Sequence, residues 1–252
     1  MSNSQWIVET LLPGGWRNAS SVLLSNGNRR LIVDTGMPHE EHQLAQALER
    51  RGLKPSDIEA VINTHFHIDH VLNNSLFANS IIYGTQESHD WCCALYSDLF
   101  NEQEWERLVL KYYPETPEYE HAADYMHQLR KLTLRWWDRK RLGAPSKYRW
   151  LESHSLPDGL EVYQTSGHVP GHISVIVPGP EFNTVVAGDA CLCRAEEARV
   201  LTMIPRDRQQ SRRDREAVLK LGRRIIPGHD VEFTQEDHQV TTSAPSESTV
   251  PR

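Results

Sequence analysis

Three histidines and one aspartate gather within a short segment in the first third of the chain. They are His65, His67, Asp69 and His70 in the run Thr64-His65-Phe66-His67-Ile68-Asp69-His70. Imidazole nitrogens and carboxylate oxygens are the donors that zinc and related cations take in hydrolytic sites. Four such groups would be costly to bury together without a cation. The segment therefore predicts a metal-dependent hydrolytic site.

The geometry of this segment predicts two metal positions. The preceding residues, Ala60-Val61-Ile62-Asn63, are typical of a short buried strand, so the cluster begins where a strand ends. In extended chain, side chains at i and i+2 share a face, so His65 and His67 can hold one cation together. Asp69 and His70 follow the turn and can address a second cation. Two neighbouring metals clamp both the attacking and the leaving atom of a hydrolysis.

Two metals need more donors than one segment supplies. Further candidates follow other strand-like segments, where the backbone can turn and side chains can converge. They are Asp34 after Leu31-Ile32-Val33, His168 and His172 after residues 160–164, Asp189 after residues 184–188, and His229 after residues 224–228. The remaining histidines are expected to be surface or hydrogen-bonded core residues: His39, His42, His89, His121, His127, His154 and His238.

The ordered series Asp-Thr-Gly, His-x-His-x-Asp-His, Gly-His, Gly-Asp and Gly-His resembles the metallo-β-lactamase superfamily over about residues 20 to 233. The resemblance implies an α/β fold, the four-layer αββα sandwich, with two zinc ions per chain, iron or manganese being alternatives. It also implies the ligands: His65, His67 and His168 for the first metal, Asp69, His70 and His229 for the second, and Asp189 bridging both. Asp34 and His172 match positions that orient ligands by hydrogen bonds; a turn-forming Asp34 and a purely structural His172 are the alternatives.

The resemblance also implies a mechanism. Two zinc ions would share a water and lower its pKa toward neutrality, giving a metal-bound hydroxide as nucleophile. Asp69 would be the catalytic residue that orients this hydroxide and carries its proton. No serine or cysteine nucleophile is required.

Two branches of the superfamily bear on the substrate. Residues 33–38 and Gly228-His229-Asp230 look like the acyl-homoserine lactonases, which open lactone rings. Two departures count against this. The glycine that follows the Asp-His pair in those lactonases is missing from the segment after His70, which begins Val71-Leu72, and Leu192 replaces a tyrosine that helps hold the substrate carbonyl there. Residues 74–77, 88–92, 160–162 and 210–212 resemble metallo-β-lactamase domain-containing protein 1 and its relatives, a group linked to RNA cleavage.

Three functions follow. We favour a binuclear zinc hydrolase of a small ester, lactone or thioester, because aromatic residues concentrated between the first cluster and His168 suggest an apolar pocket. A phosphodiesterase or ribonuclease is the first alternative, since residues 130–149 carry eight Lys or Arg against one acid. A solvated helix face explains that charge equally well, so nucleic acid is not the favoured partner. A non-hydrolytic metal-binding or redox protein is the second alternative.

Composition agrees with an enzyme that acts on a small-molecule substrate. The chain has 252 residues, 38% hydrophobic content and a formal charge of −7. We expect one domain over residues 1–240 and a disordered tail over 241–252. Neither a membrane-length apolar run nor a signal peptide is found, so the expected address is cytoplasmic, with no membrane partner. Cys92-Cys93 and Cys191-x-Cys193 are expected to be reduced thiols. A homo-oligomer remains an alternative.

A helical insertion is predicted at about residues 86–150. No strong strand signal occurs between Ile81-Ile82-Tyr83 and residues 160–164, and its clearest helix is Pro117 to Leu142, stopped by Gly143. Further helices are predicted at 39–51, before Gly52, and at 212–221. The insertion either caps the site or forms a subunit interface.

Overall fold

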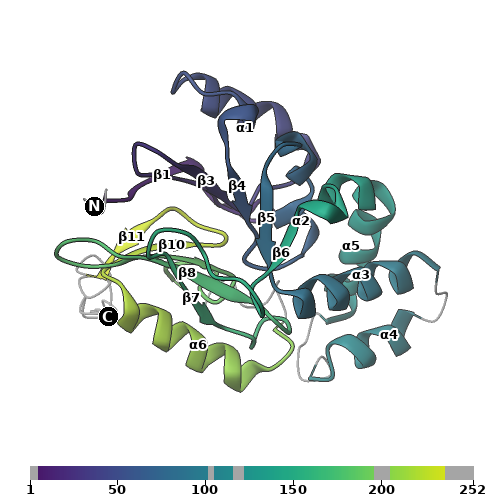
Figure 1. Cartoon of the computed structure of the whole chain (residues 1–252). Coiled ribbons are helices and arrows are strands. Elements are labelled where there is room, and N and C mark those ends of the chain that lie inside the picture. The colour runs from purple at the N-terminus through teal and green to yellow at the C-terminus, as the bar shows by residue number, and fades with distance from the viewer. Residues whose placement is uncertain (1–4, 102–104, 116–121, 196–204, 236–252) are drawn as a thin grey trace, which may run out of the picture.

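The computed structural model describes residues 5–101, 105–115, 122–195 and 205–235 (Figure 1). Its strands are β1 (Ile7–Leu12), β2 (Ser21–Ser25), β3 (Arg30–Val33), β4 (Ala60–Ile62), β5 (Ile81–Gly84), β6 (Tyr148–Trp150), β7 (Glu161–Gln164), β8 (Ile173–Val177), β9 (Thr184–Gly188), β10 (Arg224–Pro227) and β11 (Phe233–Thr234). Its α-helices are α1 (Glu41–Glu49), α2 (Ile68–Val71), α3 (Gln86–Asn101), α4 (Trp105–Tyr112), α5 (Ala122–Trp136) and α6 (Arg208–Leu221).

These strands form two sheets. The first has the order β1-β2-β3-β4-β5-β6, antiparallel from β1 to β3 and parallel from β3 to β6. The second has the order β11-β10-β9-β8-β7, with β10 and β9 as its parallel pair. The strands at the centre of each sheet, β4, β8 and β9 among them, are buried on both faces. They are accordingly continuous apolar runs.

Alternation along the strands divides the core into layers. Val22, Val33 and Ile62 of the first sheet share one cluster with Val175 and Val186 of the second, so these faces pack against each other. The opposite face of the first sheet packs on α1, and the opposite face of the second packs on α6. Figure 1 shows the resulting order of helix, sheet, sheet and helix. The predicted four-layer αββα sandwich is confirmed.

The helices α3, α4 and α5 lie together at one end of the two sheets (Figure 1). Their apolar faces form a separate cluster that includes Tyr96 and Leu129 together with Phe66 and Ile68 of the histidine-rich segment. Two hydrogen bonds tie that segment to α3: the Phe66 N–H donates to Ser88 Oγ at 3.1 Å, and the Ile68 N–H donates to Tyr96 Oη at 3.0 Å. The helical insertion therefore supports the candidate ligands directly.

The insertion differs from the prediction in two respects. It contains a strand, β6, which pairs in parallel with β5 and completes the first sheet. The predicted helix from Pro117 to Leu142 is wrong at its C-terminal end, because α5 stops at Trp136. Asp138 is extended, and its side chain accepts from the Lys140 N–H, which starts a separate 3-10 turn at Arg139–Leu142. Residues 116–121 lie outside the described residues.

The two other predicted helices are present with shifted starts. The first begins as a 3-10 turn at Pro38–Glu40 and continues as α1, and Gly52 follows it with a φ of +70°. The second, α6, starts four residues earlier than predicted, because Asp207 caps it by accepting from the Gln210 N–H at 2.8 Å.

Two expectations drawn from composition can be compared with the fold. All four cysteines are free thiols and buried, as predicted. Among the described residues, no helix is both long and apolar enough to span a membrane. The predicted tail over residues 241–252 lies outside the described residues.

Candidate metal centre

Seven predicted ligands converge where strands of the two sheets end. His65 and His67 follow β4, and Asp69 and His70 lie on the short helix α2. His168 follows β7, while Asp189 and His229 follow the parallel neighbours β9 and β10. Because the carboxyl ends of these strands meet at one edge, residues as far apart in the sequence as Asp69 and His229 come into contact.

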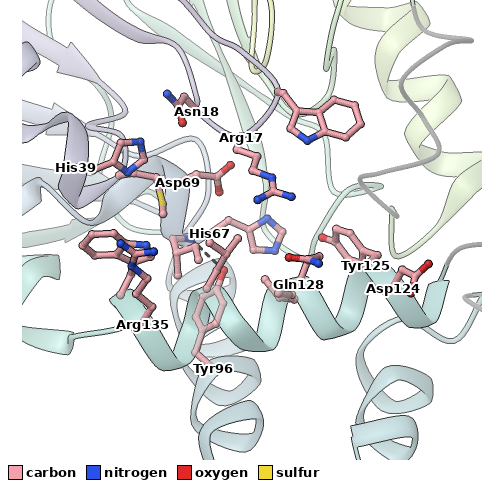
Figure 2. A pocket seen from close by; sticks show the side chains of 16 residues that line it. Arg17, Asn18, His39, His67, Asp69, Tyr96, Asp124, Tyr125, Gln128 and Arg135 are labelled. Atoms are coloured by element: carbon pink, nitrogen blue, oxygen red, sulfur yellow. Dashed lines mark hydrogen bonds between the residues drawn. The ribbon is translucent and has the colours of Figure 1, made fainter.

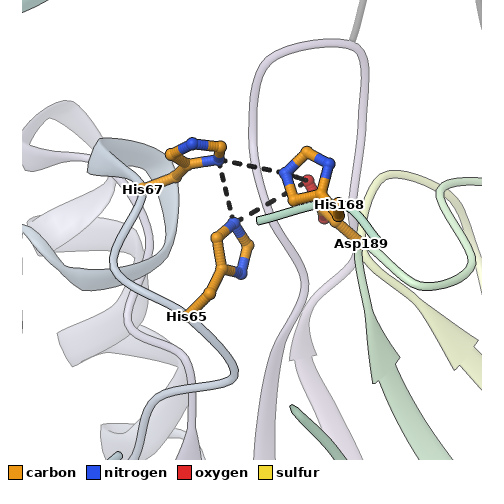
Figure 3. A group of neighbouring side chains, drawn as sticks. All are labelled: His65, His67, His168 and Asp189. Atoms are coloured by element: carbon orange, nitrogen blue, oxygen red, sulfur yellow. Dashed lines mark hydrogen bonds and ion pairs between the residues drawn. The ribbon is translucent and has the colours of Figure 1, made fainter. Parts of the chain in front are cut away.

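The first group consists of His65, His67, His168 and Asp189 (Figure 3). His67 Nδ1 lies 3.0 Å from His65 Nε2 and 3.1 Å from His168 Nε2. Asp189 Oδ2 lies 3.2 Å from His168 Nε2 and 3.9 Å from His65 Nε2. All four side chains are buried. Three imidazole nitrogens and one carboxylate oxygen thus point at a common centre, as in a tetrahedral zinc site.

The second group consists of Asp69, His70 and His229. His229 Nε2 lies 3.5 Å from Asp69 Oδ2 and 3.3 Å from Asp189 Oδ1, and His70 Nε2 also lies 3.3 Å from Asp189 Oδ1. The two oxygens of Asp189 therefore face different groups. One carboxylate joins the two sets of donors.

Glycine is required beside this shared carboxylate. A Cβ at Gly228 would collide with Asp189 Oδ1. Gly188 has a φ of +53°, and a Cβ there would stand 2.8 Å from His172 Nε2 and from Thr64 Cβ. The Gly-Asp and Gly-His pairs noted in the sequence therefore have a steric cause as well as a conformational one.

Asp34 contacts His70 directly and reaches His65 through Thr64. Its Oδ1 accepts from the Thr64 N–H at 2.8 Å, and its Oδ2 accepts from the Thr64 hydroxyl at 2.7 Å and from His70 Nδ1 at 2.8 Å. Thr64 Oγ1 in turn lies 3.1 Å from His65 Nδ1. With their Nδ1 protons engaged, both rings direct Nε2 to the centre. Asp34 has a φ of +55°, so its turn-forming geometry accompanies this contact.

His172 lies behind the two groups of donors. Its Nδ1 is 2.7 Å from Thr165 Oγ1, and its Nε2 accepts from the Asp189 N–H at 3.0 Å. Both ring nitrogens are used, so this histidine positions the Asp189 backbone and has no nitrogen left for a cation. Burial lowers the pKa of His172 to about 3, which keeps the ring neutral.

Two contacts at the site lacked a sequence signal. Tyr113 Oη lies 3.3 Å from His67 Nε2, on the side of the ring away from the centre. His229 Nδ1 lies 2.9 Å from the Gly15 carbonyl oxygen, which belongs to the loop between β1 and β2. Each contact directs the other ring nitrogen into the site.

The histidines of the two groups of donors differ in the direction of their pKa shifts. Burial lowers the pKa of His65, His168 and His67, the last to about 4. Burial also disfavours protonated His70, but the nearby Asp189 and Asp34 outweigh it and raise the pKa of His70 well above its ordinary value. The pKa of Asp189 is held low by His229, His70 and His168 despite burial.

The donor set fits a pair of cations. His70 Nε2 and both Asp189 oxygens are buried, and within the described part of the chain none of these atoms makes a hydrogen bond. Buried polar atoms without partners are costly, and a cation would satisfy them. Imidazole nitrogens outnumber carboxylate oxygens in both groups, a combination suited to zinc and also to iron or manganese.

A pocket of about 530 Å³ opens over this centre (Figure 2). Its floor includes His67 and Asp69, and one wall is a face of α5 that carries Tyr125, Leu129 and Leu132. The turn containing Trp16 and Arg17 lines it from the other side, together with Asn18, Met37, His39, Ile68, Tyr96, Asp124, Gln128, Arg135 and Trp136. The insertion therefore forms a wall of the cavity over the candidate ligands. His39, expected to be an ordinary histidine, lines this cavity, with its ring centroid 6.0 Å from that of Trp136.

The fold and site define a class of protein. The family model of the metallo-beta-lactamase superfamily matches residues 14–229, and the chain belongs to this superfamily of metal-dependent hydrolases. A curated relative, metallo-beta-lactamase domain-containing protein 1 of Xenopus laevis, is 30% identical over 215 residues, covering 84% of this chain and 71% of its own length.

Two solved structures share the fold. A protein of Thermotoga maritima assigned to the metallo-beta-lactamases matches with a TM-score of 0.59 and 18% identity, over 91% of this chain and 99% of that one. AidC, a dizinc quorum-quenching lactonase solved with its product, matches with a TM-score of 0.54 and 17% identity, over 86% of this chain and 80% of that one.

Proposed function

We propose that this protein is a binuclear zinc hydrolase of a small carboxylic ester, lactone or thioester. The observation that carries the proposal is that Asp69 belongs to the second group of donors and also lines an apolar pocket. A carboxylate in both places can act on a substrate and on the water that attacks it.

The zinc ions would be held by the seven predicted ligands, with His65, His67 and His168 on one ion, Asp69, His70 and His229 on the other, and Asp189 between them. When bound, such a pair supplies Lewis acidity and a water of lowered pKa. Asp69 would accept the proton of the attacking water and return it to the leaving oxygen or sulfur. The alternative metals remain iron and manganese.

The pocket supplies an apolar binding surface and a hydrogen-bond donor. Leu129 and Leu132 offer an apolar wall that excludes water from the reacting bond. Tyr125 lines the same wall, and burial, with Asp69 and Asp189 nearby, raises the pKa of its hydroxyl. The hydroxyl therefore stays protonated at neutral pH and can donate to a substrate oxygen.

Support for carboxylic substrates over nucleic acid comes from the shape and lining of this cavity. A volume of about 530 Å³ suits a small molecule. Part of the basic stretch at 130–149 is engaged elsewhere: Arg141 pairs with Glu41 at 3.0 Å, and Arg149 donates to backbone carbonyls. AidC, by its description, is a dizinc lactonase, which agrees with the proposed chemistry.

The test is a panel of lactone, thioester and phosphodiester substrates, assayed with the zinc-loaded wild type and with Asp69→Asn. We expect thioester or lactone turnover that falls at least about 100-fold in the variant, the usual size of a lost general base. Asp158→Asn is the matched control and should retain activity, because this exposed residue precedes β7 whereas His168 follows the other end of that strand. Cleavage of RNA alone would overturn the proposal in favour of the phosphodiesterase alternative.

A further inference from the structure

The turn between β1 and β2 presents a positive charge to the pocket. Trp16 and Arg17 form its tip, and both line the cavity. In Figure 2 the Arg17 side chain reaches from this turn toward Asp69 and His67, whereas Tyr125 and Gln128 approach from α5 on the opposite wall. The guanidinium thus enters the pocket from the wall opposite α5.

Hydrogen bonds hold this turn in place over the candidate ligands. Gly15 and Asn18 pair at its base, with N···O distances of 2.8 and 3.4 Å. The Gly15 carbonyl also accepts from His229 Nδ1, and a Cβ at Gly14 would stand 2.8 Å from His229 Cα. The Ser20 hydroxyl donates to the Pro227 carbonyl at 2.7 Å. The turn that carries Arg17 is therefore held against β10 and against His229, which follows that strand.

No carboxylate of the described residues neutralises Arg17. It makes no ion pair or hydrogen bond within that part of the chain, although the protein carries a net charge of −7. Asp124, which also lines the pocket, lies on the other side of Tyr125 from Arg17 (Figure 2). The other pocket arginine, Arg135, stands over the ring of its neighbour Trp136, with Cζ 4.7 Å from the centroid.

We propose that Arg17 binds a carboxylate on the leaving-group side of the substrate, so that the enzyme prefers an acyl ester or thioester with an apolar acyl chain and an anionic leaving group. This inference rests on the proposed function. An acyl chain lying along Leu129 and Leu132 would place its carbonyl near Asp69. The leaving group would then extend beneath the turn, where the planar guanidinium matches a carboxylate with two parallel hydrogen bonds.

Two thioesters that differ in one group test this assignment. S-hexanoyl thioglycolate carries the carboxylate, and S-hexanoyl thioglycolamide replaces it by a neutral amide; both release a thiol that is measured directly. We expect Arg17→Gln to lower kcat/KM for the thioglycolate roughly 10- to 100-fold, mainly through KM, as a lost charged hydrogen bond would. The thioglycolamide should change less than about threefold, because it lacks the charge that Arg17 recognises.

Two variants serve as controls. Arg17→Lys keeps the charge and should retain part of the preference. Arg212→Gln removes an exposed arginine on α6, away from the pocket, and should change neither substrate. An equal loss on both thioesters in Arg17→Gln would overturn the inference, as would a selective loss that appears in Arg135→Gln instead.

A readout without turnover separates this inference from the proposed function. Trp16 and Trp136 line the pocket, so binding of hexane-1-sulfonate and hexan-1-ol can be followed by tryptophan fluorescence. The wild type should bind the sulfonate more tightly, and Arg17→Gln should lose that difference. If no ester, lactone or thioester is cleaved, the proposed function fails while this preference still reports on Arg17; equal binding in both proteins would overturn the inference alone.

Discussion

Asp34 is connected by hydrogen bonds to two of the predicted ligands. One of its oxygens accepts from His70 directly, and its contacts with Thr64 reach His65. Asparagine has the same size as aspartate and also tolerates a positive φ. Its neutral amide, however, offers the His70 ring either an N–H donor or an uncharged oxygen, so the anion that holds the ring is lost. The effect should therefore fall on metal binding before it falls on folding.

We expect Asp34→Asn to weaken zinc binding by about 10- to 100-fold, the usual effect of losing a group that orients a ligand. Competition with a chelator measures the affinity, and circular dichroism verifies the fold. His172→Gln is a useful comparison, since the His172 nitrogens interact with Thr165 and with the Asp189 backbone and neither makes a hydrogen bond to another histidine among the described residues. Unchanged affinity in Asp34→Asn would contradict the role assigned to Asp34.

At this scale the sequence predicted the residues that stand in short motifs. His65, His67, Asp69 and His70 are adjacent in the chain, and His168, Asp189 and His229 each follow a strand and a glycine. Tyr113 and the Gly15 carbonyl could not be found in that way. Their contacts join residues 46 and 214 positions apart, and a backbone carbonyl carries no residue type to recognise.

The helix α5 is the element that gives the pocket its apolar wall. Leu129 and Leu132 face the cavity, whereas Leu134 on the same helix is 51% exposed. Neighbouring faces of one helix therefore offer a matched pair of sites. A bulky residue on the inner face fills the cavity, and the same residue on the outer face meets solvent.

We expect Leu132→Trp to lower kcat/KM for a decanoyl thioester at least about tenfold while an acetyl thioester changes little, because the added ring occupies space that a long chain needs. Leu134→Trp is the control and should leave both substrates unchanged. Equal losses for the short and the long chain in Leu132→Trp would mean that acyl chains do not lie along α5.

Element prediction succeeded where local signals were strong and failed where pairing decided the outcome. The apolar runs of β4, β9 and β10 were found because they are short, β-branched and followed by glycine or a polar residue. Tyr148–Trp150 lacks an apolar β-branched run and follows a basic stretch, and its strand conformation comes from pairing with β5. Tertiary pairing of this kind leaves no periodicity in the sequence.

For the whole molecule, metal binding and proton binding are linked. In the metal-free protein the pKa of His70 lies well above its ordinary value and the pKa of His229 is also raised, with Asp189 as the main cause that opposes burial, so both rings bind a proton more readily than a free imidazole. His65, His67 and His168 have lowered pKa values and stay neutral. A cation entering the second group therefore competes with protons up to a higher pH than a cation entering the first.

Zinc binding to the two groups should therefore depend differently on pH. Affinity for the second zinc should rise as the pH increases from about 6 to about 8, and affinity for the first should change little over the same range. Calorimetric titrations in buffers of different ionisation enthalpy measure both the affinities and the protons released. Equal pH dependence for both ions, or a second zinc that binds more tightly at about pH 6 than at about pH 8, would contradict this assignment of charge.

The most direct test of the account is zinc titration of metal-free protein, with thioester or lactone hydrolysis and bound metal measured on the same samples. We predict that activity appears as zinc is added, reaches its plateau at about two ions per chain, and is abolished by a chelator. Asp189→Ala should lose tight binding of both ions, because its two oxygens face the two groups. Full activity in the metal-free chain, or binding of two zinc ions with no hydrolysis of any carboxylic substrate, would contradict the account.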